Sequence, residues 1–227
     1  MTFGKKIYDF YSKLNAPVDH PDGIDVLLPF LQEETKNVNE VFYDRFYDDN
    51  NSRIFLIGIN PGRFGAGITG IPFTDPVNLE KTLGISNSFD KKHELSSRFI
   101  YSIIDRMDGP DVFFQNFYFT AVSPVGFISE GRNINYYDKK ELLTDVWESF
   151  YVDNLKIQIK AGANTECAYS LGAGMNIKYL EYLNDKFDLF QKVESLPHPR
   201  WIMQYRYKHQ QEFIERYASI LQKHISR

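Results

Sequence analysis

The sequence has almost no cysteine: Cys167 is the only one among 227 residues. A single cysteine cannot form an internal disulfide, and it cannot supply the ligands of a structural zinc site or an iron–sulfur cluster. This excludes a disulfide-stabilised domain and an enzyme whose own cysteines hold a cluster. We therefore expect an intracellular protein, in the cytoplasm or nucleoid if the source is bacterial.

Long apolar runs and a strong excess of positive charge are also missing. No stretch approaches the ~20 apolar residues of a membrane-spanning helix, and we expect no signal peptide. The formal net charge is −4, so the overall composition does not itself indicate nucleic-acid binding. However, residues 200–227 contain six Lys and Arg against two Glu. That segment fits either a local basic face or an ordinary solvated helix.

Short apolar runs alternate with segments of helical periodicity along the chain. The expected strands are residues 54–59, 112–119, 167–172 and 191–196. The expected helices are residues 3–14, 24–47 with a break at Asn37, 96–107, 139–147, 173–187 and 203–225. Buried strands that alternate with helices are typical of a parallel sheet covered on both faces. We therefore predict a three-layer α/β/α fold around a mainly parallel four-stranded sheet. We expect residues 1–227 to form one domain, with residues 1–50 as a helical part packed on it.

In a parallel α/β sheet, ligands bind beyond the carboxyl ends of the strands. The first distinctive segment, residues 58–73, directly follows the strand 54–59 and contains five glycines. It could be a surface loop without chemistry, or a phosphate loop, since residues 65–70 fit G-x-G-x-x-G. The phosphate-loop match is weak because it begins several residues after the strand. A third interpretation is a nucleobase pocket, in which Asn60 holds a water and Phe73 stacks on a flipped base.

The segment 58–73 also fits a longer pattern, G-x-N-P-G-x-F-G, three residues, then T-G-x-P-F, at every fixed position. It resembles the first active-site motif of the single-strand-selective monofunctional uracil-DNA glycosylase family, within the uracil-DNA glycosylase superfamily. The resemblance implies that Asn60 is catalytic and orients the attacking water. It also implies a DNA contact at Arg63 and substrate contacts at Gly58, Ile59, Gly62, Phe64, Gly65 and Phe73.

The second distinctive segment, residues 196–201, follows the last expected strand and reads Leu-Pro-His-Pro-Arg-Trp. A lone histidine such as His198 is more often structural than catalytic. Its place at a strand's carboxyl end resembles the family's His-Pro loop, although this loop is two residues shorter before the arginine. The resemblance implies that His198 is catalytic and donates a hydrogen bond to the leaving base. It implies DNA contacts at Pro199, Arg200 and Trp201.

Two further segments support the resemblance. Asn116, at the expected end of the strand 112–119, matches the family's base-reading Asn, although a strand-end Asn can simply cap a turn. The tripeptide Gly131-Arg132-Asn133 resembles the family's G-R-N loop. Arg132 would then contact a phosphate, or be an ordinary surface arginine.

The resemblance implies a monofunctional DNA glycosylase in base excision repair. It would hydrolyse the N-glycosidic bond of uracil in DNA and leave an abasic site. The expected partner is DNA, single- or double-stranded, and we expect a monomer with no metal, no cofactor and no membrane contact. Gly62 leaves space near C5 of the base, so 5-hydroxymethyluracil is also an expected substrate. The alternatives are a silent DNA-binding member, an enzyme for another lesion such as a deaminated purine, or a nucleotide-binding α/β protein.

Overall fold

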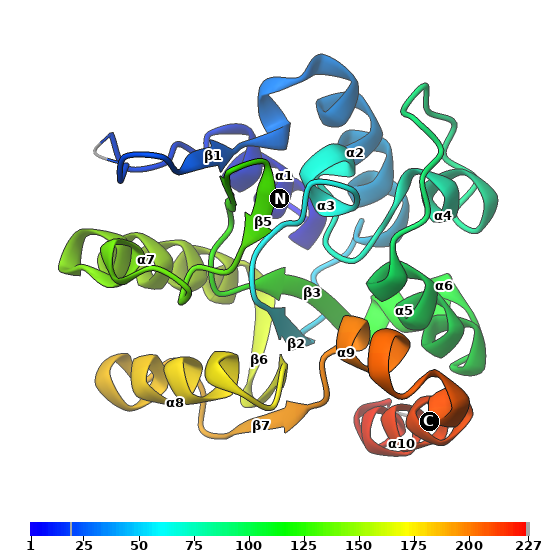
Figure 1. Ribbon diagram of the computed structural model, residues 1–227. Coiled ribbons are helices and arrows are strands. Elements are labelled where there is room, and N and C mark those ends of the chain that lie inside the picture. The colour runs from blue at the N-terminus through cyan, green and yellow to red at the C-terminus, as the bar shows by residue number, and fades with distance from the viewer. Residues whose placement is uncertain (19, 226–227) are drawn as a thin grey trace.

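A computed structural model describes residues 1–18 and 20–225, and Figure 1 shows the arrangement of its elements. The central sheet has four strands in the order β3-β2-β6-β7, and all three strand pairs are parallel. The strands are β2 (Arg53–Gly58), β3 (Phe117–Ala121), β6 (Ala163–Leu171) and β7 (Val193–Leu196). The prediction of a parallel four-stranded sheet is confirmed.

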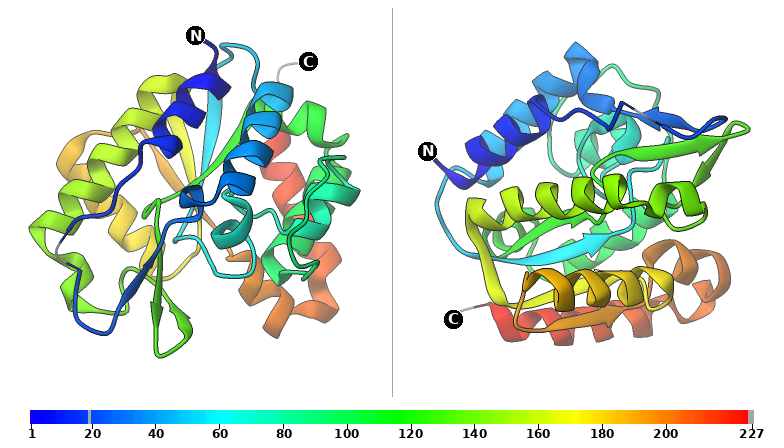
Figure 2. Two further views of the ribbon diagram at one scale, coloured as in Figure 1. Left: turned by 90° about the horizontal axis from the view of Figure 1, so that it is seen from above. Right: turned by 90° about the vertical axis from the view of Figure 1, so that its left-hand side faces the viewer.

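Helices cover both faces of this sheet (Figure 2). One face carries α1 (Phe3–Ser12), α7 (Asp145–Gly162) and α8 (Met175–Phe187), and the other carries α5 (Leu95–Arg106), α9 (Pro199–Tyr205) and α10 (Gln210–Leu221). On the first face, the Tyr118 hydroxyl donates to Gln158 of α7, and the ring of Phe3 packs edge-on against Tyr118 at 5.1 Å. On the second, α5 packs against α9 and α10.

The strand β2 is completely buried and forms the centre of the molecule. Its apolar run, rich in β-branched residues, fits a strand with neighbours on both sides and helices on both faces. The one charged residue in β2, Arg53, is also buried, and its guanidinium lies 4.7 Å from the ring centroids of both Phe3 and Tyr47. Arg53 donates to a carboxylate oxygen of Asp49 at 2.8 Å and to the carbonyl of Phe114 at 2.8 Å.

The expected strand 112–119 is wrong over its first five residues. Residues Pro110–Asn116 form the helix α6, and β3 begins at Phe117. Gly109 has a positive φ of 89°, and Pro110 occupies the first turn, where a missing N–H and a fixed φ favour a helix start. These two residues outweigh the strand-like run of aromatic residues that follows them.

Three other expectations also need correction. The expected helix 139–147 contains the 3-10 turn η2 (Lys140–Leu143) and only the start of α7, which continues to Gly162. In residues 24–47, β1 (Asp25–Leu27) and a 3-10 turn, η1 (Pro29–Leu31), precede α2 (Glu33–Phe46), which runs through Asn37 without a break. The strand β1 joins an antiparallel sheet with β4 (Gly126–Ser129) and β5 (Arg132–Ile134), in the order β1-β4-β5. The last expected helix, 203–225, is instead divided between α9 and α10 by the turn η3 (Tyr207–His209).

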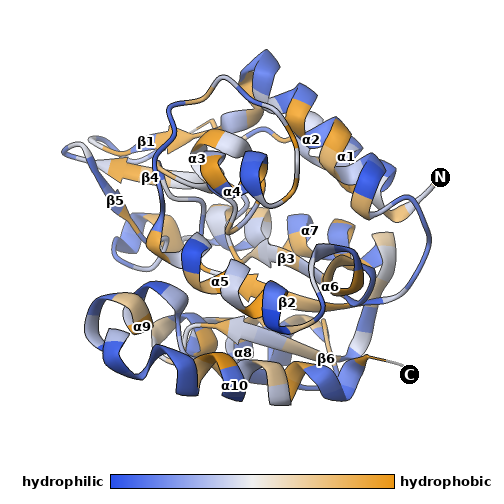
Figure 3. Cartoon of the chain, turned by 90° about the vertical axis from the view of Figure 1, so that its right-hand side faces the viewer, coloured by the Kyte–Doolittle hydropathy of each residue, from blue (hydrophilic) through white to orange (hydrophobic). Residues whose placement is uncertain are grey.

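The remaining elements are short: α3 (Ala66–Thr69), α4 (Pro76–Lys81), η2 (Lys140–Leu143) and η4 (Gln222–His224). One contiguous hydrophobic core joins the sheet to the helices, and hydrophilic residues gather on the outward sides of the helices (Figure 3). None of the helices in residues 1–18 and 20–225 has the length and apolar character needed to span a bilayer.

Candidate active site

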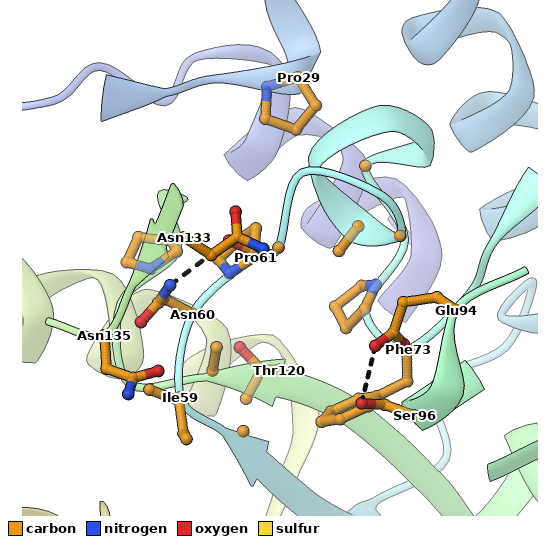
Figure 4. Close-up of a pocket in the computed structure, with 18 of the residues that line it drawn as sticks. Pro29, Ile59, Asn60, Pro61, Phe73, Glu94, Ser96, Thr120, Asn133 and Asn135 are labelled. Carbon is orange, nitrogen blue, oxygen red and sulfur yellow. Dashed lines mark hydrogen bonds between the residues drawn. The ribbon is translucent and has the colours of Figure 1, made fainter. Parts of the chain in front are cut away.

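A pocket opens beyond the carboxyl ends of β2 and β3, where parallel-sheet proteins bind their ligands (Figure 4). It encloses about 1060 Å³ of empty space, its open mouth included. Eight residues that the sequence singled out line this pocket: Gly58, Ile59, Asn60, Gly62, Gly65, Phe73, His198 and Arg200. The two distinctive segments, far apart in the sequence, therefore meet at one site.

The side-chain amide of Asn60 has a fixed orientation. Its Nδ2 donates to the carbonyl of Ile134 at 3.2 Å and, at 3.4 Å, to that of Pro61, while its Oδ1 accepts the Tyr136 main-chain N–H at 3.1 Å. These contacts define which end of the amide is the oxygen. One Oδ1 lone pair remains available to accept a hydrogen bond from a water.

Phe73 provides the aromatic face of the pocket. Its ring lies against the backbone of Gly58, where an added Cβ would come within 2.8 Å of the ring's Cζ. Its other neighbours are the rings of Phe119 and His198, with centroids 5.3 and 6.5 Å away. Phe73 also has a left-handed φ of 56°, an uncommon conformation for a bulky residue that concentrates at functional sites.

His198 is held in one tautomer. It is the N-cap of α9, and its Nδ1 accepts the main-chain N–H of Arg200 at 3.1 Å. The nitrogen Nδ1 therefore carries the lone pair, and a neutral ring carries its proton on Nε2. Burial and, to a smaller extent, the positive charge of Arg200 lower the pKa of His198 to about 4. The ring is thus a neutral hydrogen-bond donor at physiological pH.

Sequence reasoning missed two polar residues at the start of α5. Glu94 and Ser96 line the pocket near Phe73, across from Asn60 and Asn135 (Figure 4). Glu94 caps α5 by accepting the N–H of Ser97 at 2.9 Å, and it accepts the Ser96 hydroxyl at 3.0 Å. No motif marks these residues, because only the packing of α5 brings them to the pocket.

The expectation for Asn116 is wrong. It is the last residue of α6, before β3 begins, and thus lies at the amino end of the strand rather than the carboxyl end. Its Nδ2 donates to the carbonyl of Val112 at 2.9 Å within the helix. At the carboxyl end of β3, the pocket is lined instead by Thr120 and Ala121.

Five other expected contacts lie outside the pocket wall. The guanidinium of Arg63 donates to the carbonyl of Gly131 and lies 4.6 Å from the ring centroid of Phe64, which is 41% exposed. Arg132 begins β5 and is exposed.

In the loop after β7, Pro199 is buried in the first turn of α9 and starts that helix. Trp201 is 40% exposed on α9, beside the pocket residue Arg200.

The site also bears on metal binding and on the nucleotide-loop alternative. Within the described part of the chain, no group of three or more His, Cys, Asp or Glu side chains is placed to hold a metal ion. Residues 65–70 flank and form α3, a helix of only four residues, which is much shorter than the helix that normally follows a dinucleotide-binding loop.

Comparison with known proteins decides the family. The sequence-family model of the uracil DNA glycosylase superfamily matches residues 45–222. The chain belongs to that superfamily. Among solved structures, it is similar to the crystal structure of wild-type SMUG2 from Pedobacter heparinus, with a TM-score of 0.93, 39% sequence identity and coverage of 98% of each chain. No curated protein matches it.

Membership in the uracil DNA glycosylase superfamily supports DNA glycosylase activity for this chain, a hydrolysis of N-glycosidic bonds. It confirms the resemblance to this superfamily that residues 58–73 indicate. It also removes the basis for the nucleotide-binding alternative, because the glycine-rich segment is part of the superfamily's matched region.

Proposed function

We propose that this pocket excises uracil, and uracil with a small 5-substituent such as 5-hydroxymethyl, from DNA. The reaction hydrolyses the N-glycosidic bond and leaves an abasic site. One observation carries the proposal: two neutral polar groups of fixed orientation, Asn60 and His198, face the same pocket as the aromatic ring of Phe73. That combination suits a reaction in which an oriented water attacks and a nucleobase leaves as an anion.

Asn60 holds the attacking water. Its Oδ1 already accepts one hydrogen bond from the Tyr136 N–H, and its free lone pair accepts a second from the water. An amide is neutral and is not a strong base. Its contribution is therefore positional, and stabilisation of the departing base and of the oxocarbenium-like sugar lowers more of the barrier.

His198 stabilises the departing base. The Nε2–H of its neutral ring donates to the base oxygen on which negative charge develops as the bond breaks. Loss of one such donor typically costs about 2.7–4 kcal/mol of transition-state stabilisation. A neutral donor suits this task because the ring does not lose its proton to the base in the ground state. Phe73 meanwhile stacks on the face of the base.

Gly62 supports the acceptance of 5-substituted uracil. It lines the pocket without a side chain, and an added Cβ would meet only the Asn133 amide nitrogen, at 3.4 Å. The wall is therefore open at this position. The lining residues that the structure describes include no lysine, which supports a monofunctional enzyme that does not cleave the strand through an amine intermediate.

A second candidate substrate is a deaminated purine. Asn116 lies away from the pocket, and Ala121 at the end of β3 has no group that reads the edge of a base. No side chain of β3 therefore offers an amide that could read the edge of uracil. A pocket without that amide discriminates less strictly between lesions.

The surface beside the pocket supports a DNA contact. Exposed Arg200 lines the pocket mouth, and Trp201 next to it is stacked by the guanidinium of Arg206, 5.0 Å from the ring centroid. Residues 199–209 carry three Arg or Lys and no acidic residue. We propose that this segment follows the DNA strand that flanks the flipped nucleotide, together with Arg63 and Arg132, whose neighbours Gly62 and Asn133 line the pocket. We also propose that a monomer is sufficient for binding.

Product formation on defined lesions tests the proposal. Labelled single-stranded and duplex oligonucleotides would each carry one uracil, 5-hydroxymethyluracil, thymine, cytosine, hypoxanthine or xanthine. We expect alkali-dependent strand cleavage at uracil and 5-hydroxymethyluracil, and no cleavage without alkali. Cleavage restricted to hypoxanthine or xanthine would replace the first candidate by the second. DNA binding without cleavage at any lesion would identify a silent member.

A further inference from the structure

The orientation of Asn60 depends on a buried tyrosine outside the pocket wall. Tyr136 follows β5, and its main-chain N–H is the donor that occupies Oδ1 of Asn60. The Ile134 carbonyl in the same segment accepts from Nδ2. The side chain of Asn60 is thus held by a loop that is 74 and 76 residues away in the sequence.

The loop is itself fixed by the hydroxyl of Tyr136. This side chain is fully buried, and its hydroxyl donates to Oδ1 of Asn176 at 3.0 Å. Burial raises the pKa of Tyr136 far above its ordinary value, so the hydroxyl keeps its proton and remains a donor. The rings of Tyr137, Tyr151 and Tyr179 surround it, with centroids 5.0 to 5.4 Å away.

Asn176 connects this loop to the strand that ends at Asn60. It is the second residue of α8 and is 1% exposed. Its Nδ2 donates to the carbonyls of Ile57 and Gly58, both at 3.3 Å, and to the Ser170 hydroxyl at 3.0 Å. The two carbonyls belong to the last two residues of β2, which lead into Asn60.

We propose that Tyr136 and Asn176 are positioning residues that set the place of the water held by Asn60. The side-chain amide of Asn176 hydrogen-bonds both to the backbone that leads into Asn60 and to Tyr136, in the loop that holds the Asn60 side chain. Movement of either would displace Oδ1 from the bond to be cleaved. A misplacement of about 1 Å can cost up to ~10²-fold in rate when a group acts by position. This inference rests on the proposed function.

The substitution Tyr136→Phe tests it, with Tyr151→Phe as a matched control. Both tyrosines are fully buried in one aromatic cluster, but the Tyr151 hydroxyl donates to the Leu142 carbonyl and has no link to Asn60. We expect Tyr136→Phe to lower the single-turnover excision rate about ten-fold, within the range that misplacement produces. Its DNA dissociation constant and its melting temperature should match those of Tyr151→Phe. Equal excision rates in the two variants would overturn the inference.

A double substitution separates positioning from general loss of structure. In an Asn60→Ala background there is no amide to position, so adding Tyr136→Phe should leave the residual rate unchanged. Asn176→Ala should likewise lower the rate in the wild-type background and leave the residual rate of Asn60→Ala unchanged. If Asn176→Ala fails to fold, the comparison of Tyr136→Phe in the two backgrounds still tests the inference. A further rate loss in the Asn60→Ala background would contradict the inference.

The wild-type rates keep the two proposals distinguishable. Whichever lesion the wild type excises, uracil or a deaminated purine, serves as the substrate for the Tyr136→Phe and Asn60→Ala comparison. The role of Tyr136 can therefore be tested even if uracil is not the substrate. A wild-type enzyme inactive on every lesion would contradict both the proposed function and the role of Tyr136.

Discussion

The main-chain N–H of Arg200 donates to Nδ1 of His198 at 3.1 Å, and this contact fixes the chemistry of the ring. In the neutral ring, Nδ1 is the nitrogen that could accept a proton from solvent, and the Arg200 N–H already occupies it. Burial and the neighbouring arginine lower the pKa of His198 to about 4. We therefore expect His198 to act as a hydrogen-bond donor through Nε2 and not as a general acid.

A pH profile of the excision rate should reflect this neutral ring. The rate should show no step near 6.5, the ordinary pKa of histidine, between about pH 5 and pH 8. It should fall only as the pH approaches 4 and His198 gains a second proton. Because the folded-state pKa is depressed, acidification from 6.5 toward 4 also favours proton uptake by the unfolded chain and lowers stability. Single-turnover rates in matched buffers test this, and a midpoint near 6.5 would contradict it.

Gly58→Ala should displace Phe73 from its stacking position. The added Cβ would come within 2.8 Å of the Phe73 ring. We expect a rate loss of about ten-fold or more, since small misplacements at an active site have effects of up to ~10²-fold. Gly174→Ala is the control, because an added Cβ there meets nothing within 4 Å. Single-turnover excision by both variants is the measurement, and equal rates would argue against stacking on Phe73.

Arg200→Gln should weaken DNA binding by removing a phosphate contact. The slope of log affinity against log salt concentration should become smaller by about 1, which corresponds to one fewer phosphate contact. Arg216→Gln, which removes an exposed arginine from α10, should leave the slope unchanged. Fluorescence anisotropy with labelled oligonucleotides at several salt concentrations tests this. A shallower slope for Arg216→Gln alone would place the DNA on another face.

Asp49→Asn should destabilise the protein above about pH 4. Asp49 is the counter-charge of buried Arg53. Burial by itself raises the pKa of Asp49, but hydrogen bonds from Arg53 and the Asn51 N–H outweigh it, so the pKa lies below its ordinary value. The ion pair therefore stabilises the protein above the unfolded-state pKa, and this contribution disappears as the pH falls through the folded-state pKa.

At neutral pH, the expected loss in the free energy of unfolding is about 1.5–3 kcal/mol, the range for hydrogen bonds to charged groups. Asp48→Asn is the neighbouring control, since Asp48 is exposed. Urea unfolding of both variants at several pH values is the measurement. A difference between them that persists in strong acid would contradict the role of the Asp49 carboxylate.

The sequence predicted the sheet and the two ends of the pocket for clear physical reasons. The apolar, β-branched run of β2 has few alternatives to a buried strand, and Asn60, Phe73 and His198 follow strands directly or lie in a motif of fixed spacing. The same reasoning failed at Asn116. The aromatic run around it fits a buried helix or a buried strand equally well, and periodicity cannot separate short segments of the two kinds.

Other parts of the site depend on contacts that no local pattern records. Glu94 reaches the pocket only because α5 packs there, and the three-residue strands β1 and β5 are too short to give a clear alternation. The link from Asn60 through Tyr136 to Asn176 joins three segments that are far apart in the chain. Such tertiary hydrogen bonds become visible only when the fold is known.

The most direct test of the proposed function compares wild type with Asn60→Ala and His198→Ala on a uracil-containing oligonucleotide. Abasic-site formation would be followed under single-turnover conditions, with DNA dissociation constants measured on uncleaved DNA. We predict excision by the wild type and losses on the order of 10²–10³-fold in each variant, with DNA binding retained. Wild-type excision that either substitution leaves intact would contradict the assignment of these two residues as the catalytic pair.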